Sequence, residues 1–213
     1  MKATKEYGEQ YDDAEAIAYQ NRHQDKHAAE LRLIDRAFAA IPRQQRVLDI
    51  PCGGGRVMMH LASQGYPVSG ADISEGMLKV ARAQAAQLGR DCRIDAQDVE
   101  HLTYPDRHFD TIICFRLFHH FPTAEIRRRA VSELCRVAAS NVVLSYFNPH
   151  SLSAFYFNLR RGNSRPNRAP KYATSLAELT GYFRVAGFRL RQDFAQLRYI
   201  HSLHLAAWER ATR

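Results

Sequence analysis

Short apolar runs alternate with longer amphipathic stretches along most of the chain. Apolar residues of the longer stretches recur every three or four positions, which is the spacing of one helix face. The short runs are bounded by Gly, Pro or Asp, as buried strands commonly are. We predict strands at 46–50, 68–71, 92–96, 109–115, 142–147, 188–194 and 200–208. We predict helices within 12–40, from a glycine-rich loop to about 64, and at 74–88, 122–139 and 174–187.

The order of these elements predicts an α/β fold. Strands and helices alternate up to the fifth strand, except that a loop joins the third strand to the fourth, and a helix and two strands follow. Such alternation of strands and helices predicts a mostly parallel, doubly wound sheet with helices on both faces. In a sheet of this kind, ligands bind in a crevice at the carboxyl ends of the strands. We predict one domain over residues 1–213, made of an N-terminal helical cover (1–44), a cofactor-binding core (45–147), an acceptor-recognition insertion (148–173) and a C-terminal helix with strands (174–213).

The net charge of +8 is concentrated toward the C-terminal end of the chain. Residues 1–149 hold 19 basic and 19 acidic residues, whereas residues 150–213 hold 11 basic and 3 acidic ones. An excess this local indicates either an anionic partner or a solvated basic face, and the sequence leaves both open. No apolar run approaches the roughly 20 residues that cross a bilayer, and the N-terminus has no signal-peptide core, so we expect a cytoplasmic protein. No spaced ligand set indicates a metal site.

The loop after the first predicted strand carries the strongest functional signal. Residues 47–56 read VLDIPCGGGR, with three glycines between a strand and a helix. Glycines at such a turn let the backbone approach a ligand that lies at the helix N-terminus. A dinucleotide-binding fold needs a third glycine or alanine where this chain has Met58, which argues against a nicotinamide cofactor. Asp72, about 20 residues further on, suits any cofactor with a ribose.

This loop resembles motif I of the class I, seven-strand S-adenosylmethionine-dependent methyltransferases, usually V-L-D-x-G-C-G-x-G. Pro51 is the departure, because the family usually has glycine there. Residues 70–74, 97–110 and 114–120 resemble three further motifs of the family in the same order. The resemblance covers about residues 45–145. It implies a Rossmann-like sheet of seven mostly parallel strands, with S-adenosylmethionine as cofactor and S-adenosylhomocysteine as product.

The resemblance also implies a role for the motif residues. Asp72 would bind both ribose hydroxyls, and Ile73 would lie against the adenine. Asp98 would accept a hydrogen bond from the adenine amino group, and the Val99 N–H would meet a ring nitrogen. A backbone carbonyl at the end of the fourth strand would face the amino group of the cofactor. The predicted cofactor-binding residues are Asp49, Pro51, Gly53, Gly55, Asp72, Ile73, Asp98, Val99, Cys114 and Phe115.

The residues that recognise and activate the methyl acceptor have no comparable motif. Methyl transfer needs a general base only when the acceptor is a neutral hydroxyl or amine. His120, Tyr19 and Tyr146 are candidates for that base, each weighed against ordinary packing. The insertion holds several arginines, whose planar forks suit a phosphate or a carboxylate. The predicted acceptor-binding residues are Arg116, Arg160, Arg161, Arg165 and Arg168.

Three functions remain open on the sequence. The first is a methyltransferase for a small or envelope-associated acceptor, such as a lipid or a glycan, that is either anionic or neutral. The second is a nicotinamide-dependent oxidoreductase, and the third is a protein that binds S-adenosylmethionine without catalysis. We expect no nucleic acid partner, because no RNA-binding module is recognisable. We also expect no membrane-spanning segment, although aromatic residues beside the arginines leave contact with a lipid surface open. The sequence predicts no particular oligomeric state.

Overall fold

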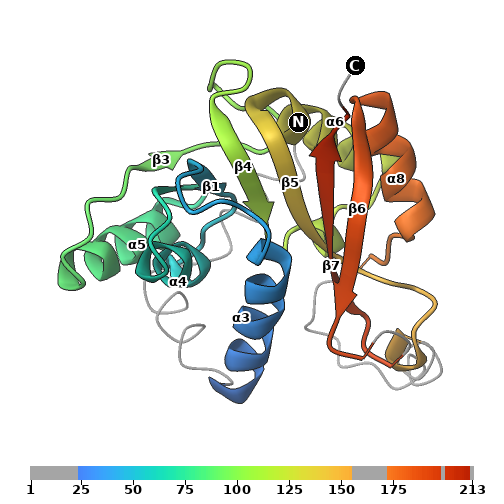
Figure 1. Ribbon diagram of the computed structural model, residues 1–213, viewed down its shortest axis with the longest axis horizontal. Helices are drawn as coiled ribbons and strands as arrows, with labels where there is room; N and C mark the ends of the chain where they lie inside the picture. The colour runs from blue at the N-terminus through green and yellow to red at the C-terminus, as the bar shows by residue number, and fades with distance from the viewer. Residues whose placement is uncertain (1–23, 155–171, 198–199, 212–213) are drawn as a thin grey trace.

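The computed structural model of the protein describes residues 24–154, 172–197 and 200–211. The helices are α3 (Gln24–Phe38), α4 (Arg56–Ser63), α5 (Glu75–Gln87), α6 (Ala124–Val137) and α8 (Leu176–Val185), with a 3-10 turn η1 (Phe118–His120). The strands are β1 (Val47–Asp49), β2 (Val68–Asp72), β3 (Ile94–Ala96), β4 (Phe109–Cys114), β5 (Ala138–Phe147), β6 (Phe188–Ala195) and β7 (Leu203–Arg210). Figure 1 shows their arrangement around the central sheet.

The seven strands form one sheet in the order β3-β2-β1-β4-β5-β7-β6. Neighbouring strands from β3 to β5 are parallel, whereas β7 runs antiparallel to both β5 and β6. The chain starts the sheet at β1, moves outward to β3, and then crosses back to β4. Ligands bind at such a reversal in open α/β sheets, outside the carboxyl ends of the strands. The predicted doubly wound, mostly parallel seven-stranded fold is therefore confirmed.

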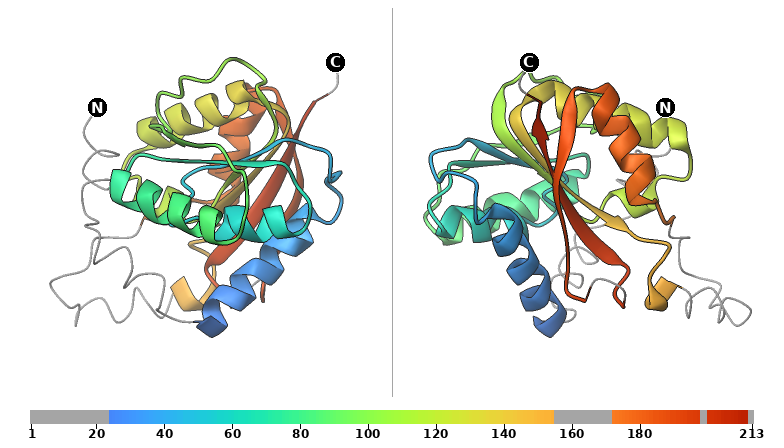
Figure 2. Two further views of the ribbon diagram at one scale, coloured as in Figure 1. Left: turned by 90° about the vertical axis from the view of Figure 1, so that its left-hand side faces the viewer. Right: turned by 45° about the vertical axis from the view of Figure 1, so that its right-hand side comes forward.

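Helices cover both faces of the sheet, and each face has its own apolar core (Figure 2). On one face, α3, α4 and α5 bury residues such as Ile34 and Leu78. On the other face, α6 and α8 bury Leu134 and Phe183, and the Phe183 ring stacks on Trp208 with centroids 3.9 Å apart. Strands that are buried on both faces read as continuous apolar runs, which explains their appearance in the sequence.

Three helices begin at a residue whose side chain caps them. Ser74, Thr123 and Ser175 each precede a helix, and each hydroxyl accepts a hydrogen bond from the backbone N–H three residues further on. Such caps satisfy one of the backbone donors that a helix start leaves unpaired. The predicted start at Ser74 is confirmed, and the helix predicted from 122 is capped by Thr123 and begins at Ala124.

Several predicted boundaries were wrong by a few residues. β5 begins at Ala138, not at 142, because α6 ends at Val137 and Ala138 is already extended and pairs with Phe109. β7 runs over Leu203–Arg210 rather than 200–208, and β3 is shorter than predicted. These boundaries depend on which strands pair, and local sequence signals report that poorly. Only the part of the predicted N-terminal cover from α3 onward lies within the described residues.

Candidate cofactor site

The carboxyl ends of β1, β2 and β4 lie side by side, because these strands are parallel neighbours. Asp49 is the last residue of β1, Asp72 of β2 and Cys114 of β4. The loop after β1 starts at this edge, where the Ile50 N–H donates a hydrogen bond to the Ile113 carbonyl at 2.9 Å. The parallel sheet thus brings motif residues that are far apart in the sequence to one edge.

The loop between β1 and α4 has a left-handed backbone at two positions. Gly53 has φ +52° and Gly55 has φ +91°, conformations that glycine adopts at little cost. A Cβ on Gly55 would also lie 3.3 Å from the Cε atom of Met58. The Ile50–Pro51 peptide bond, where the chain departs from the usual motif glycine, is cis. Because neither glycine has a side chain, the backbone of this loop stays accessible to a ligand at the N-terminus of α4.

Asp72 joins this loop to the start of α5. Its Oδ2 atom accepts a hydrogen bond from the Gly53 N–H at 2.8 Å, and its Oδ1 atom accepts one from the Ser74 N–H at 2.9 Å. Burial raises the pKa of Asp72 above its ordinary value, and the hydrogen bonds from Ser74 and Gly53 partly offset that effect. The carboxylate is held from two sides, so its remaining lone pairs have a fixed direction.

The segment after β3 lies beside the end of β2. The Gln97 N–H donates a hydrogen bond to the Asp72 carbonyl at 3.0 Å, and Asp98 follows directly. Val99 is buried and Ile73 is half-buried. The three residues assigned to the adenine by resemblance are therefore neighbours of the residue assigned to the ribose.

Asp49 is a buried acid, only 1% exposed, at the end of β1. Burial raises its pKa to about 8, and Asp72 adds to the rise, while the Met58 N–H and the Arg56 charge lower it in part. Neither carboxylate oxygen accepts a hydrogen bond with normal geometry from any residue that the structure describes. Buried polar groups are normally paired, so such an acid fits a site that a positively charged ligand completes.

A buried glutamate joins two arginines at the same edge. Glu30 of α3 is buried, and its Oε2 atom lies 2.8 Å from Nη2 of Arg56, while its Oε1 atom lies 2.5 Å from Nη1 of Arg116. Arg56 is the first residue of α4, and Arg116 follows β4. We call these three residues the Glu30 cluster. Sequence reasoning missed Glu30 and gave Arg56 no role, because a glutamate on a charged amphipathic helix carries no signal that sets it apart.

Arg116 is the one predicted acceptor arginine within the described residues. It has φ +61°, an uncommon conformation for a residue other than glycine. The Arg116 N–H donates a hydrogen bond to the Ser145 hydroxyl at 2.6 Å, which helps to hold this conformation. The preceding residue, Phe115, is buried, and its ring centroid lies 5.7 Å from the guanidinium carbon of Arg56. The backbone after β4 is therefore held in a specific, strained geometry.

The other predicted acceptor and catalytic residues have different outcomes. Tyr146 is 1% exposed, and its hydroxyl donates a hydrogen bond to Asp193 at 3.1 Å. The His204 Nδ1 atom lies 2.8 Å from Asp193 as well, so Tyr146 belongs to a buried polar cluster of β5, β6 and β7. His120 is in η1, with its ring 4.1 Å from that of His119. Outside the described residues lie Tyr19, Arg160, Arg161, Arg165 and Arg168.

Two properties of the described ranges bear on the remaining predictions. Within them, no helix is both long enough and apolar enough to span a membrane. The same ranges contain no group of three His, Cys, Asp or Glu side chains that could hold a metal ion.

Comparison with known proteins identifies the domain. Residues 47–141 match the model of a methyltransferase domain family. Over 78 residues the chain is 40% identical to the ubiquinone biosynthesis O-methyltransferase of Coxiella burnetii (strain Dugway 5J108-111), which is 37% of this chain and 33% of that protein. Over 154 residues it is 30% identical to the protein of the same name from Azoarcus sp. (strain BH72), which is 68% of this chain and 65% of the relative. The chain thus spans about a third of the first relative's length.

Solved structures share the fold over most of the chain. Magnesium protoporphyrin IX methyltransferase from Synechocystis PCC 6803 with bound S-adenosylmethionine superposes with a TM-score of 0.73 at 18% identity, over 99% of this chain and 98% of that one. A protein from Pyrococcus horikoshii OT3 also has a TM-score of 0.73, at 19% identity over 89% and 93% of the two chains. At these identities the likeness is evidence for the fold alone.

The sheet order, the glycine loop and the acids at the strand ends define a Rossmann-like domain that binds a nucleoside cofactor. Residues 47–141 thus match a methyltransferase domain family, and the chain shares the fold of solved S-adenosylmethionine-dependent methyltransferases. The resemblance seen in four motifs is confirmed, and the cofactor class is S-adenosylmethionine rather than a nicotinamide dinucleotide.

Proposed function

We propose that this chain transfers a methyl group from S-adenosylmethionine to an oxygen atom of a small-molecule acceptor. The observation that carries the proposal is the hydrogen bond between Asp72 and Gly53, which joins the β2 acid and the glycine loop at the edge where the family binds its cofactor. The names of the relatives support a small acceptor, because they refer to ubiquinone biosynthesis and to magnesium protoporphyrin IX. The word O-methyltransferase in those names supports oxygen as the acceptor atom.

The described residues fit the parts of the cofactor in sheet order. Asp98 and Val99 beyond β3 would hold the adenine, and Asp72 at β2 would hold the ribose hydroxyls. Asp49 at β1 has a buried carboxylate that would meet positive charge, and the amino-acid end of S-adenosylmethionine carries both an ammonium and a sulfonium. Bound there, the cofactor supplies a methyl group on a sulfonium leaving group that is already activated.

The protein then has to position the two reactants and keep water away. Holding the donor and the acceptor in line converts a bimolecular encounter into an effectively unimolecular step, which can lower the barrier substantially. The covered edge serves this purpose, because α3 lies over it and contributes Glu30. Once ionised by a bound positive charge, Asp49 would add a negative charge near the sulfonium, in a place where burial strengthens electrostatic interactions.

For the acceptor, we propose an anionic group that Arg116 contacts from the end of β4. Arg116 has a fixed backbone and a side chain at the cofactor edge. An acceptor oxygen that is already ionised needs no general base. The hydroxyl of Tyr146 is engaged with Asp193, which favours the packing alternative over the base predicted for it. The arginines of the insertion remain candidates for the same recognition.

A binding measurement and a transfer measurement test the proposal together. S-adenosylhomocysteine should bind in calorimetry and raise the melting temperature, because it binds the folded state selectively. Labelled S-adenosylmethionine should then methylate members of a panel of phenols, carboxylates and phosphate esters. Absence of both binding and thermal shift at millimolar ligand would contradict the cofactor assignment. Binding without transfer to any member of the panel would favour a non-catalytic binding protein.

A further inference from the structure

The Glu30 cluster holds two positive charges and one negative charge. Glu30 is buried, and each of its carboxylate oxygens contacts one arginine, Arg56 or Arg116. One positive charge therefore remains without a negative partner within the cluster. Part of this excess positive charge lies on Arg56. Its Nη1 atom is buried and has no hydrogen-bond partner among the residues that the structure describes. Such a buried guanidinium nitrogen has lost its hydrogen bonds to water and gained none in the protein. This costs free energy unless a ligand supplies a hydrogen-bond acceptor.

The sheet order places this unsatisfied group at one end of the cofactor. Adenine and ribose contacts are assigned to β3 and β2, at one side of β1. The rest of the cofactor has to extend across the end of β1 toward β4. Arg56 begins α4 directly after the glycine loop, and its guanidinium lies over the ring of Phe115, just beyond β4. Arg56 therefore lies where the amino-acid end of the cofactor would be, together with Asp49.

That end of the cofactor carries one carboxylate and one ammonium. Among the residues that the structure describes, Nη1 of Arg56 and the carboxylate oxygens of Asp49 have no hydrogen-bond partner with normal geometry. We propose that Arg56 binds the carboxylate at the amino-acid end of S-adenosylmethionine and that Glu30 is the positioning residue that orients it. The inference rests on the proposed cofactor binding at this edge. Charge-assisted pairs between a guanidinium and a carboxylate are among the stronger hydrogen bonds in proteins.

Glu30 acts through Arg56 rather than on the ligand. Its Oε2 atom engages Nη2 of Arg56, which leaves Nη1 of the same planar group to face a second acceptor. Because Glu30 also holds Arg116, it links α3 to both α4 and the segment after β4. The Arg56 guanidinium could equally bind a carboxylate of the methyl acceptor. The experiment therefore has to distinguish the carboxylate of the cofactor from that of the acceptor.

The experiment compares S-adenosylmethionine with decarboxylated S-adenosylmethionine, which keeps the ammonium and the sulfonium but lacks the carboxylate. Calorimetric affinities are measured without acceptor for the wild type and for Arg56→Gln, Arg56→Lys and Glu30→Gln. The matched control is Arg127→Gln, because Arg127 is also a largely buried arginine paired with a glutamate, Glu178, but on α6. Circular dichroism melting of each variant verifies that it is folded.

We expect the wild type to prefer the carboxylated ligand by about tenfold or more, the size of one hydrogen bond to a charged group. Arg56→Gln should abolish most of this preference with little effect on the decarboxylated ligand, and Arg56→Lys should restore part of it. Glu30→Gln should reduce the preference, and Arg127→Gln should leave it unchanged.

Two results would overturn the assignment. The first is a wild type that binds both ligands equally. The second is a preference that persists in folded Arg56→Gln, and if that variant also transferred methyl groups more slowly to carboxylate acceptors only, Arg56 would be assigned to the acceptor. Failure of the wild type to bind either ligand would instead contradict the proposed function, so the two failures are distinguishable.

Discussion

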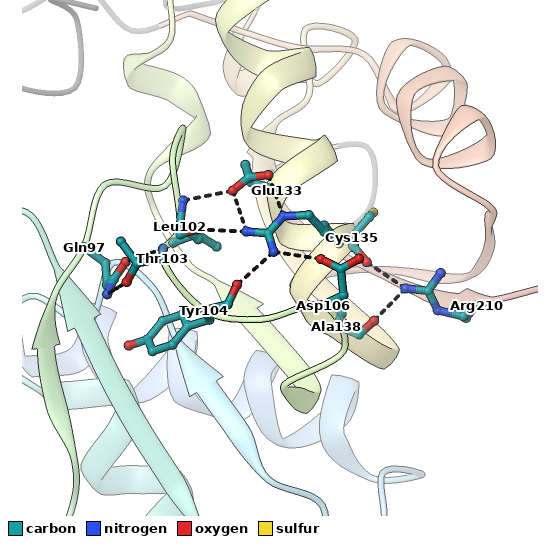
Figure 3. Close-up of polar contacts among 10 residues, drawn as sticks. Gln97, Leu102, Thr103, Tyr104, Asp106, Glu133, Cys135, Ala138 and Arg210 are labelled. Carbon is teal, nitrogen blue, oxygen red and sulfur yellow. Dashed lines mark hydrogen bonds and ion pairs between the residues drawn. The ribbon is translucent and has the colours of Figure 1, made fainter.

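At the amino-terminal edge of the sheet, charged side chains are paired on several sides, whereas at the carboxyl-terminal edge Asp49 and Arg56 keep buried atoms that have no partner among the described residues. The amino-terminal edge is organised by Arg136 of α6, which donates hydrogen bonds to the carbonyls of Leu102 and Tyr104 at 2.8 Å each. It also pairs with Glu133 at 2.8 Å and with Asp106 at 2.9 Å. Figure 3 shows these four partners close together. Leu102, Tyr104 and Asp106 lie on the loop that leads into β4, and Glu133 lies on α6.

Arg210 of β7 completes that edge. Its Nη2 atom donates to the carbonyls of Cys135 and Ala138 at the end of α6, at 2.7 and 2.6 Å (Figure 3). At the carboxyl-terminal edge, by contrast, Asp49 and Arg56 have buried atoms that no described residue satisfies. At the amino-terminal edge, paired charges stabilise the fold. At the carboxyl-terminal edge, buried charged groups without a partner lower the stability of the free protein, and a bound ligand that pairs with them would raise it again. The comparison predicts that substitutions at the two edges affect different quantities.

Among single substitutions compared at one pH, the largest expected effect is on stability, at the amino-terminal edge. Arg136→Met should lower the free energy of unfolding by about 2–4 kcal/mol, because it removes charged hydrogen bonds and leaves buried carbonyls without a donor. Urea denaturation measures this loss, and affinity for S-adenosylhomocysteine should stay nearly unchanged. The exposed pair between Arg189 and Glu209 is the control, and Arg189→Met should cost less than about 1 kcal/mol. Equal losses in the two variants would contradict the special role of Arg136.

The next effect is on affinity, at the carboxyl-terminal edge. Asp72→Ala should weaken binding of S-adenosylhomocysteine by about 1.5–3 kcal/mol, because it removes a charged acceptor for the ribose hydroxyls. Asp72→Asn should recover part of the affinity, since its amide oxygen still accepts a hydrogen bond. Calorimetry checks both variants. An unchanged affinity in Asp72→Ala would show that the ribose lies elsewhere.

A third effect appears in the pH dependence and comes from Asp49. Its pKa is about 8 in the folded protein without ligand, above the ordinary value of 3.8, so folding takes up a proton between these pH values. The contribution of Asp49 to stability should therefore fall as pH rises from about 4 to about 8 and level off above that, with a slope of at most about 1.4 kcal/mol per pH unit. Thermal melts at several pH values would measure this slope, which Asp49→Asn should remove.

Cofactor binding should show the opposite trend. The positive charges of S-adenosylmethionine favour ionised Asp49, so binding near pH 7 should release a proton and the affinity should rise with pH up to about 8. Calorimetry in buffers of different ionisation enthalpy detects that proton. If wild type and Asp49→Asn release the same number of protons, Asp49 does not meet the charge of the cofactor.

The smallest effect separates packing from catalysis at Tyr146. Tyr146→Phe removes a hydroxyl that donates to Asp193, so the free energy of unfolding should fall by about 1 kcal/mol. If the residue only packs, kcat should change little and its pH profile should keep its shape. A large loss of kcat with unchanged stability would instead revive Tyr146 as a general base. Urea denaturation and steady-state kinetics on the same preparation decide between the two.

Much of the cofactor edge could be predicted because it depends on short-range signals. The glycines of the loop and the cap at Ser74 mark a strand, a turn and a helix start within a few residues. Alternation of strands and helices then requires a parallel sheet, which brings Asp49 and Asp72 to one edge. By contrast, no local signal marks the start of β5 at Ala138, because that boundary depends on pairing with β4.

The sequence by itself determined the order of the elements, the glycine turn and the class of cofactor, since each rests on residue types within one short segment. Only the tertiary structure decided which charges meet. Glu30 contacts Arg56 and Arg116 across separations of 26 and 86 residues, and no spacing rule predicts such pairs. It also decided that Asp49 is buried enough to raise its pKa, because desolvation depends on every element packed around a group and not on its neighbours in the chain.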